Sequence, residues 1–407
     1  MSKIAGQNRL RLGIIGLGQA GAMIVDEMRT APDLPWVIAA GADPRAQARE
    51  RFAAEFGGGA YADAAALCRD ADVDAVYIAS PSWLHLEHAK AAAAHGKHII
   101  CEKPLTLSLD DAVAMVETAN RAGVVLLAGH THSFDAPIVT MTELVKSGRI
   151  GALRAINAWN FNEFNHRPRL LAELEATHGP VLNQGPHHVD IVRQIGGGLV
   201  KSVRATTIPD GVTGYEGGYV CYLEFENRVP ATLVYDGRSL FDTAELFGWV
   251  GEGGNLRDPK SNERNRRAFL ELMERPEDER DARLEAGKEN GRYGGATAGQ
   301  LLNAHAGRAR PHQPFFGLVV VSGEDATIRQ SADGLYLYDK DGRQEIALPR
   351  KEGGRLAELT EMHEALSGGR KPFHDGRWGL ATLEVCFGIL ESARTGREVA
   401  MARQVAI

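Results

Sequence analysis

The sequence predicts a two-domain α/β protein: an N-terminal Rossmann domain with a doubly wound parallel sheet, then an α+β domain with a large, open, mostly antiparallel sheet. Short apolar runs alternate with helical patterns from about Leu10 to Gly148. After Gly151 the expected strands are longer and alternate apolar with polar residues. A chain of 407 residues also exceeds the usual size of one domain.

The first part of the chain indicates repeated βαβ units. Its apolar runs predict buried strands in LRLGIIG, PWVIAAGAD, VDAVYIAS, KHIICE and VVLLAGH. Helical patterns lie between them in QAGAMIVDEMR, RAQARERFAAEF, LHLEHAKAAAAHG and SLDDAVAMVETANRAG. Ser108 is expected to cap a helix N-terminus, and Gly96 and Gly123 are expected at helix C-termini. Because such units place consecutive strands side by side in the same direction, a parallel sheet follows.

The second part predicts strands with a period of two. They lie in ALRAINAWNF, KSVRATTI, YVCYLEFENRVPATLVYDG, FFGLVVVSG and GLYLYDKDGRQEIALP. Asp341-Gly342 indicates a hairpin turn in the last of these, and a helix is expected around His187 to Gln194. The stretch RWGLATLEVCFGILESARTGREVAM predicts an amphipathic helix ending near Gly396.

Residues 250–312 differ in composition from the rest of the chain. They are highly charged and punctuated by glycine, which predicts one solvated helix between glycine-rich loops. The segment is a lid, an arm used in assembly, or an exposed insertion without a task. We therefore expect domains at 1–148 and 149–375, with 376–407 as a helix packing back on the first domain.

Composition and charge exclude several classes of protein. The net charge is −7 and charges of both signs are interspersed, so no nucleic-acid partner is expected. The four cysteines have no CxxC spacing, which argues against a disulfide framework or a structural zinc site and favours the cytoplasm. The first residues, MSKIAGQNRLRLG, do not resemble a signal peptide, and no stretch is apolar enough for a membrane span.

A glycine-rich turn is the strongest motif in the sequence. Gly16, Leu17, Gly18, Gln19, Ala20 and Gly21 follow an apolar strand and open a helix. The three glycines allow a tight turn, close approach of a pyrophosphate, and close packing of helix on strand. Asp43, at the end of the second strand, is placed to accept hydrogen bonds from a ribose. Its carboxylate favours NAD, but Arg45 could offset the repulsion of a 2′-phosphate, so NADP stays open.

Two further segments follow apolar strands. Ser80, Pro81 and His85 come at the end of the predicted strand VDAVYIAS and after it, and Glu102-Lys103-Pro104 comes at the end of KHIICE. Because ligands bind at the carboxyl ends of parallel strands, both segments are expected to border the nicotinamide half of the cofactor. Proline restricts the backbone of Lys103 to an extended conformation, which helps to fix the direction of the lysine.

With these residues, the chain resembles the glucose-fructose oxidoreductase / inositol dehydrogenase (Gfo/Idh/MocA) family. The resemblance rests on the GLGxAG turn, ASPSWLH, CEKP and NQGPHHVD, and extends over nearly the whole chain. It implies that Lys103 and His187 act on a substrate hydroxyl while a hydride passes to the nicotinamide.

One position departs from the family pattern. The family usually has Asp where this chain has Asn183, and an amide cannot accept a proton. His187 and Lys103 would then transfer the proton alone, with Asn183 supplying hydrogen bonds to the substrate. Asp190 could substitute electrostatically, although a structural role is the more usual one at such a position.

A segment rich in arginine narrows the resemblance. His166-Arg167-Pro168-Arg169, with NQGPHHVDIVR and GEDATIRQSADGLYLYD, resembles the phthalate dihydrodiol dehydrogenase-like branch. That branch implies a cyclic vicinal diol, and Arg167 and Arg169 could clamp its carboxylates, unless they are two arginines of a solvated loop. Sugars and cyclitols remain open as substrates.

The histidines also raise a metal hypothesis. His130 and His132 would share one face of a strand, but no further ligand with suitable spacing completes a zinc site, so no metal is expected. We instead expect His130 to contact the substrate.

We therefore predict an NAD(P)-dependent oxidoreductase that oxidises a secondary hydroxyl of a cyclic polyol, sugar or dihydrodiol carboxylate in a cleft between the domains. One alternative holds its NAD tightly and uses transient oxidation for elimination or hydrolysis. Others are a non-catalytic NAD sensor and a metal hydrolase. A homodimer or homotetramer through the open sheet is expected.

Overall fold

The computed structural model describes residues 9–296, 310–350 and 354–407. The chain divides into two compact units. Unit 1 comprises Met1–His130, Ala286–Arg308 and Gly354–Leu380, and unit 2 comprises Thr131–Glu285, Ala309–Gly353 and Ala381–Ile407. The expected domains at 1–148, 149–375 and 376–407 stay a prediction.

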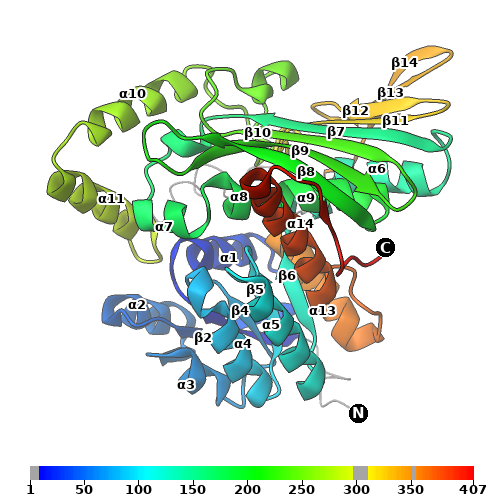
Figure 1. Cartoon of the computed structure of the whole chain (residues 1–407). Coiled ribbons are helices and arrows are strands. Elements are labelled where there is room, and N and C mark those ends of the chain that lie inside the picture. The colour runs from blue at the N-terminus through cyan, green and yellow to red at the C-terminus, as the bar shows by residue number, and fades with distance from the viewer. Residues whose placement is uncertain (1–8, 297–309, 351–353) are drawn as a thin grey trace. The chain divides into compact units, whose positions relative to one another are not determined.

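Unit 1 contains a six-stranded parallel sheet in the order β3-β2-β1-β4-β5-β6 (Figure 1). This is the strand order of doubly wound dinucleotide-binding folds. The strands are β1 (Leu10–Ile15), β2 (Trp36–Ala42), β3 (Gly59–Tyr61), β4 (Ala75–Ile78), β5 (His98–Glu102) and β6 (Leu126–Gly129). The predicted Rossmann sheet is confirmed, with the three-residue β3 as an addition.

The helices of this unit follow the strands as βαβ units require. They are α1 (Gln19–Thr30), α2 (Ala46–Phe56), α3 (Ala64–Cys68), α4 (His85–Ala94), α5 (Leu109–Ala122) and α13 (Arg355–Gly368), with the 3₁₀ turn η1 (Ser82–Leu84). Ser108 caps α5, since its Oγ accepts a hydrogen bond from the Asp111 amide at 3.1 Å. Gly96 and Gly123 both have φ of +67°, as expected of residues that end helices.

Unit 2 contains a nine-stranded sheet in the order β14-β13-β12-β11-β7-β10-β9-β8-β15 (Figure 1). Only the β7–β10 pair is parallel among its pairings, so the predicted mostly antiparallel sheet is confirmed. The strands are β7 (Leu153–Phe161), β8 (Val200–Pro209), β9 (Glu216–Phe225), β10 (Pro230–Asp236), β11 (Leu318–Gly323), β12 (Thr327–Gln330), β13 (Gly334–Asp339), β14 (Gly342–Ala347) and β15 (Val399–Ala400). The expected hairpin joins β13 to β14, with Asp339 opposite Gly342.

Helix α9 (Gly185–Gly196) is buried along its whole length and packs on β7 and β10. The other helices are α6 (Ala136–Lys146), α7 (Leu171–Ala176), α8 (Pro180–Asn183), α10 (Ser261–Met273), α11 (Glu277–Gly291) and α14 (Gly376–Thr395); α11 and α14 each extend across both units. The 3₁₀ turns are η2 (Thr131–Phe134), η3 (Phe164–His166) and η4 (Thr243–Phe247).

The single helix expected in residues 250–312 is wrong. The described part of this segment forms two helices, α10 and α11. Pro276 lies between them, and proline both lacks the amide hydrogen and clashes with the preceding turn, which ends a helix. Residues 297–309 of the predicted insertion lie outside the described residues.

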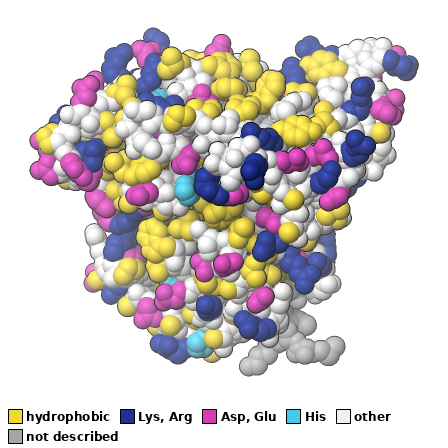
Figure 2. Space-filling model, in the orientation of Figure 1, with side chains coloured by type: hydrophobic (Ala, Val, Ile, Leu, Met, Phe, Trp, Pro, Cys, Tyr) yellow, Lys and Arg dark blue, Asp and Glu magenta, His cyan; other side chains and the backbone are white. Residues whose placement is uncertain are grey.

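The distribution of surface charges and the state of the cysteines agree with the sequence composition. On the face drawn in Figure 2, lysine and arginine side chains are interspersed with acidic ones. All four cysteines are buried free thiols. Within the part of the chain that the structure describes, no helix has the length and apolar character needed to cross a membrane.

Candidate active site

The glycine-rich turn has the geometry that a pyrophosphate requires. Gly16 has φ of +93°, and a Cβ there would lie 2.7 Å from the Ser80 amide nitrogen, so no larger residue fits. A Cβ on Gly21 would lie 2.1 Å from the Gly16 carbonyl oxygen. By contrast, a Cβ on Gly18 would meet nothing within 4 Å, so open space lies beside this backbone. Because α1 begins at Gln19, its amide groups and positive dipole end face that space, and the site fits a dinucleotide.

Asp43 lies at the end of β2 and is bonded on several sides. Its Oδ2 accepts from the Leu17 amide at 2.9 Å. Its Oδ1 accepts from the backbone amide and Nε of Arg45, both at 2.9 Å. Arg45 also donates from Nη2 to the Leu17 carbonyl at 2.7 Å. The structure therefore brings together the predicted ribose carboxylate, its neighbouring cation and the glycine turn.

The loops that follow β4 and β5 are joined by His85. Its Nε2 lies 2.9 Å from the Ser80 carbonyl oxygen, and its Nδ1 lies 3.1 Å from that of Pro104. The ring is 1% exposed, and burial lowers its pKa. His85 thus positions these two loops. Ser80 itself bonds His88, with Oγ and Nδ1 2.8 Å apart.

Lys103 follows β5 at the carboxyl edge of the sheet, and its peptide bond to Pro104 is cis. The preceding Glu102 is buried, and its Oε1 accepts from Tyr77 Oη at 3.0 Å and Arg355 Nε at 2.9 Å. Arg355 comes from α13 and also pairs with Glu27 of α1 at 3.3 Å. A network of buried charges therefore holds the residue beside the predicted catalytic lysine.

A second buried carboxyl, Glu358, belongs to this network. Its Oε2 lies 3.2 Å from Tyr77 Oη. Burial would raise the pKa of Glu102, but the charges of Arg355 and Lys103 lower it below its usual value. Burial and the charge of Glu102 instead raise the pKa of Glu358 well above its usual range. The two carboxyls therefore differ: the neighbouring cations favour the ionised form of Glu102, whereas burial and the charge of Glu102 favour the neutral form of Glu358.

In unit 2, His187 lies in the first turn of α9, and Asn183 ends α8 just before it. His187 is buried, with 6% of its surface exposed. Asn183 Oδ1 accepts a hydrogen bond from Gln184 Nε2 at 3.0 Å. Asp190 lies one turn further on; its Oδ1 accepts from the Thr382 hydroxyl at 3.3 Å, beside Arg193. This places Asp190 in a structural cluster within unit 2.

Two rings that the sequence did not connect with His187 lie against it. The ring centroid of His132 is 4.9 Å away and that of Phe316 is 5.5 Å away. His132 Nδ1 is held by Asp135 Oδ2 at 2.9 Å. Asn160, at the end of β7, holds Phe316 by donating to its carbonyl oxygen. The result is an apolar and aromatic wall around one imidazole.

Arg167 and Arg169 follow η3. Arg167 Nη2 lies 3.4 Å from Glu252 Oε1, and the charge of Glu252 raises the pKa of Arg167 against the effect of burial. Burial and the nearby Arg167 lower the pKa of Arg169 to about 10. Arg169 stacks over Phe164, 4.4 Å from the ring centroid, and among the described residues its buried Nε has no hydrogen-bond partner. Two cations are thus held close together, and Glu252 is the carboxylate that pairs with Arg167.

Glu252 links this pair to the histidines. Burial would raise its pKa, but Arg167, His132 and Arg257 lower it. Arg257 fixes the glycine-rich loop that carries Glu252, since it bonds Asp242 at 2.7 Å and Glu163 at 2.6 Å. Nothing in the sequence pattern pointed to Glu252 or Phe316, because tertiary packing brings Glu252 to Arg167 and Phe316 to His187 from distant parts of the chain. The spacing of His132 and Asp135 could have indicated their pair.

The expected strand through His130 and His132 is wrong. β6 ends at Gly129, and His132 lies in the 3₁₀ turn η2. The two rings therefore do not alternate along one strand. Among the described residues, no group of three or more His, Cys, Asp or Glu side chains is arranged to hold a metal ion. That His130, which is buried at the end of unit 1, contacts the substrate stays a prediction.

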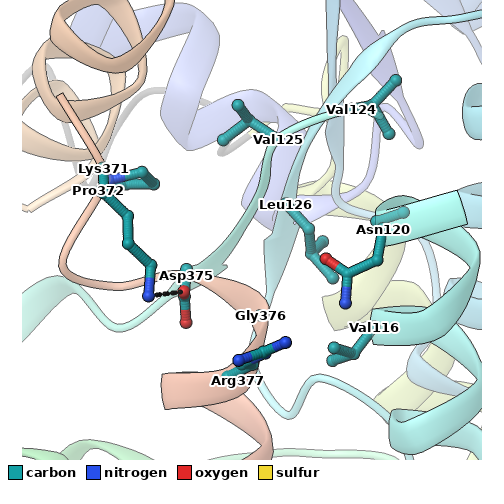
Figure 3. A pocket seen from close by; sticks show the side chains of 11 residues that line it. Val116, Asn120, Val124, Val125, Leu126, Lys371, Pro372, Asp375, Gly376 and Arg377 are labelled. Atoms are coloured by element: carbon teal, nitrogen blue, oxygen red, sulfur yellow. Dashed lines mark ion pairs between the residues drawn. The ribbon is translucent and has the colours of Figure 1, made fainter. Parts of the chain in front are cut away.

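A surface pocket of unit 1 lies at the amino-terminal end of strand β6 (Figure 3). Val124 and Val125 line it where the chain enters β6, and Lys371 and Asp375 form an ion pair at 3.3 Å on its opposite side. Dinucleotides bind at the carboxyl ends of parallel strands, so this pocket at an amino end is not the cofactor site.

Comparison with known proteins agrees with this geometry. Residues 10–130 match the oxidoreductase family model with an NAD-binding Rossmann fold, and residues 138–256 match the GFO/IDH/MocA C-terminal domain. The chain is 33% identical to 1-carboxy-3-chloro-3,4-dihydroxycyclohexa-1,5-diene dehydrogenase of Comamonas testosteroni, over 95% of each chain. It is 29% identical to myo-inositol 2-dehydrogenase of Thermotoga maritima, over 60% of this chain and 74% of that one.

A solved structure from Bordetella bronchiseptica RB50 is similar throughout. It is 35% identical, with a TM-score of 0.85, and the match covers 96% of this chain and 100% of that one. The chain belongs to the GFO/IDH/MocA oxidoreductase family. It is an NAD(P)-dependent dehydrogenase with an NAD-binding Rossmann fold, as the sequence predicted.

Proposed function

We propose that this dehydrogenase oxidises a secondary hydroxyl of a cyclic diol that carries a carboxylate. The observation that supports this substrate class is the arginine pair of unit 2. Arg167 already has Glu252 as a counter-ion, whereas the buried Nε of Arg169 has no hydrogen-bond partner among the described residues. A partly buried guanidinium whose Nε lacks an acceptor favours an anionic ligand, and guanidinium groups bind carboxylates in a bidentate manner.

The relative from Comamonas testosteroni supports the same class, because its name describes a ring with a carboxyl group and two neighbouring hydroxyls. Neutral sugars and cyclitols carry hydroxyls without that anion. The myo-inositol 2-dehydrogenase matches a smaller share of this chain.

In the proposed reaction, NAD held by the glycine-rich turn and Asp43 would supply the acceptor for a hydride from the carbinol carbon, and the hydroxyl oxygen loses a proton. Lys103 or His187 receives that proton, so the products are a ketone, NADH and one proton. His187 suits this role because His132 and Phe316 restrict its ring. Asn183 would donate or accept hydrogen bonds at the substrate, since its amide cannot take the proton.

The test of proton handling is the Lys103→Met variant. We expect unchanged NAD affinity and a fall in kcat of at least ~100-fold, the usual contribution of a positioned acid or base. His187→Ala should cost a similar factor, with a double variant no worse than the product of the two. Lys90→Met, on the exposed surface of α4, is the matched control. Unchanged turnover in Lys103→Met would refute the role of the lysine.

The test of substrate class compares a cyclic dihydrodiol carboxylate with the same diol lacking the carboxyl group. Removing one partner of a buried charge pair costs about 2 kcal/mol or more, so Arg169→Met should raise KM for the carboxylate at least ~30-fold. KM for the uncarboxylated diol should stay within about twofold. Arg267→Met, whose side chain is 69% exposed on α10, is the control. An equal change for both substrates would argue against a carboxylate clamp.

The same assay separates a dehydrogenase from an enzyme with tightly held NAD or a sensor. A dehydrogenase releases one NADH per ketone formed. Product without net NADH would favour transient oxidation, and no product from any diol, inositol or sugar would favour a sensor. We also propose a cytoplasmic location, in keeping with the four free thiols.

A further inference from the structure

A short part of the charged segment at residues 250–312 belongs to unit 1, which contains the glycine-rich turn. Residues 289–293 comprise the end of α11 and the residues just after it, and we call them the 289–293 segment. Glu289 of this segment contacts Arg45, although the two residues are 244 positions apart in the sequence. The amide of Tyr293 also donates to the Leu17 carbonyl oxygen at 3.2 Å. The segment therefore lies directly on the turn that fits the pyrophosphate.

Tyr293 anchors the segment in the core of unit 1. The residue is 4% exposed, and its ring meets Phe52 of α2 with centroids 6.2 Å apart. Its hydroxyl donates to Glu55 Oε2 at 2.5 Å, and the Arg51 guanidinium lies 5.7 Å from its ring centroid. Burial of a whole tyrosine side chain fixes the segment far more firmly than a surface contact would.

Glu289 extends the charge chain around the ribose carboxylate. Arg45 donates to Asp43 through Nε and Nη2, to the Leu17 carbonyl through Nη2, and reaches Glu289 Oε2 through Nη1 at 3.3 Å. Arg292 forms a close ion pair with the other oxygen of Glu289. The guanidinium of Arg45 is thus divided between two carboxylates and a carbonyl oxygen.

We propose that the 289–293 segment is the outer wall of the adenosine half of the cofactor site, and that Glu289 disfavours NADP. The wall is a cofactor-binding element of this chain and does not depend on how the proton is handled. Asp43 accepts the ribose hydroxyls, as a carboxylate at this strand end does. Glu289 holds Arg45 in place through one carboxylate oxygen, and Arg292 holds Glu289 through the other.

A 2′-phosphate would meet a specific obstacle here. An arginine binds phosphate by directing its N–H groups at the phosphate oxygens. Arg45 can do so only by leaving Glu289 or Asp43, and the phosphate would also face their negative charges. Arg45 alone would suggest that the site tolerates NADP. Because Asp43 and Glu289 occupy its N–H groups, the site favours NAD instead.

The first experiment measures cofactor affinity of the Tyr293→Ala variant by calorimetry. We expect Kd for both NAD and NADP to rise about 10-fold, since the wall detaches from the turn. Tyr293→Phe, which keeps the ring, should change Kd much less. If the alanine variant does not fold, amide hydrogen exchange of the wild-type protein decides. NAD should slow exchange in a peptide covering 286–296. Equal exchange with and without NAD would contradict the proposal that the 289–293 segment borders the cofactor.

The second experiment concerns the choice between the two cofactors. Glu289→Gln should lower Kd for NADP about threefold or more and leave Kd for NAD within about twofold, as expected for one partly screened charge. Glu285→Gln, one turn earlier on α11 and also exposed, removes the same charge away from Arg45 and is the matched control. An unchanged ratio of the two Kd values, or the same change in Glu285→Gln, would overturn the role of Glu289.

Discussion

At the scale of single residues, the carboxyls behind Lys103 show how position separates chemically equal groups. Glu102 and Glu358 both contact the Tyr77 hydroxyl, at 3.0 and 3.2 Å. Of the two, only Glu102 accepts a hydrogen bond from Arg355. The Tyr77 hydroxyl has one hydrogen, so it can donate to Glu102 and accept a hydrogen bond from a protonated Glu358. Protonation of Glu358 therefore lets three buried groups satisfy one another without a second buried charge.

A pH-dependent stability follows for Glu358. Its folded pKa is raised, so its contribution to stability is present below about pH 4.5, the unfolded value, and is lost as the pH rises through the folded value. Glu358→Gln is neutral at every pH. The variant should melt at a higher temperature than wild type at neutral and alkaline pH, and this advantage should disappear in acid.

Between the two pKa values the difference in unfolding free energy should grow by up to ~1.4 kcal/mol per pH unit. Thermal unfolding at several pH values measures it, and Glu345→Gln on the exposed strand β14 controls for the lost surface charge. A melting difference that stays constant with pH would contradict a protonated Glu358.

At the scale of elements, the sequence predicted what local patterns determine. The strand patterns of the parallel sheet, the cap at Ser108 and the β13–β14 hairpin are each visible within a few neighbouring positions, and all are confirmed. The break before α11 needed more weight on Pro276, whose effect is local. The turn at His130 to His132 was mistaken for a strand because HxH alternation alone does not distinguish it from a 3₁₀ turn.

In the candidate site too, some residues could be predicted from local patterns and others could not. Asp43 and Lys103 follow apolar strands, so their placement at one sheet edge could be predicted. The partners that set their environment come from distant segments, as Arg355 reaches Glu102 across 253 positions. Glu252 and Tyr293 lie in stretches whose composition indicates only a charged, glycine-rich insertion. Such contacts are created by tertiary packing and leave no periodic signal.

At the scale of the whole molecule, the nine-stranded sheet has one face buried by α9 and one that carries exposed apolar residues. Trp159, Val220 and Tyr222 are 40%, 44% and 42% exposed. Val234 lies opposite both Val220 and Trp159 in the register, so these side chains form a continuous row across β9, β10 and β7. Chains that remain monomeric rarely leave large contiguous apolar patches in water.

We therefore expect a homodimer or homotetramer that buries this row, because an isologous contact pairs the same patch on two copies. Multi-angle light scattering at micromolar concentration should give a multiple of the 44.0 kDa chain mass. A Trp159→Lys, Tyr222→Lys double variant should shift the mass to that of one chain, since like charges would have to be buried without partners. Leu240→Lys, at a side chain that is 75% exposed outside the sheet, should leave the mass unchanged. A wild-type protein that is only monomeric under these conditions would show that the row is not an interface, and an unchanged mass in the double variant would place the interface elsewhere.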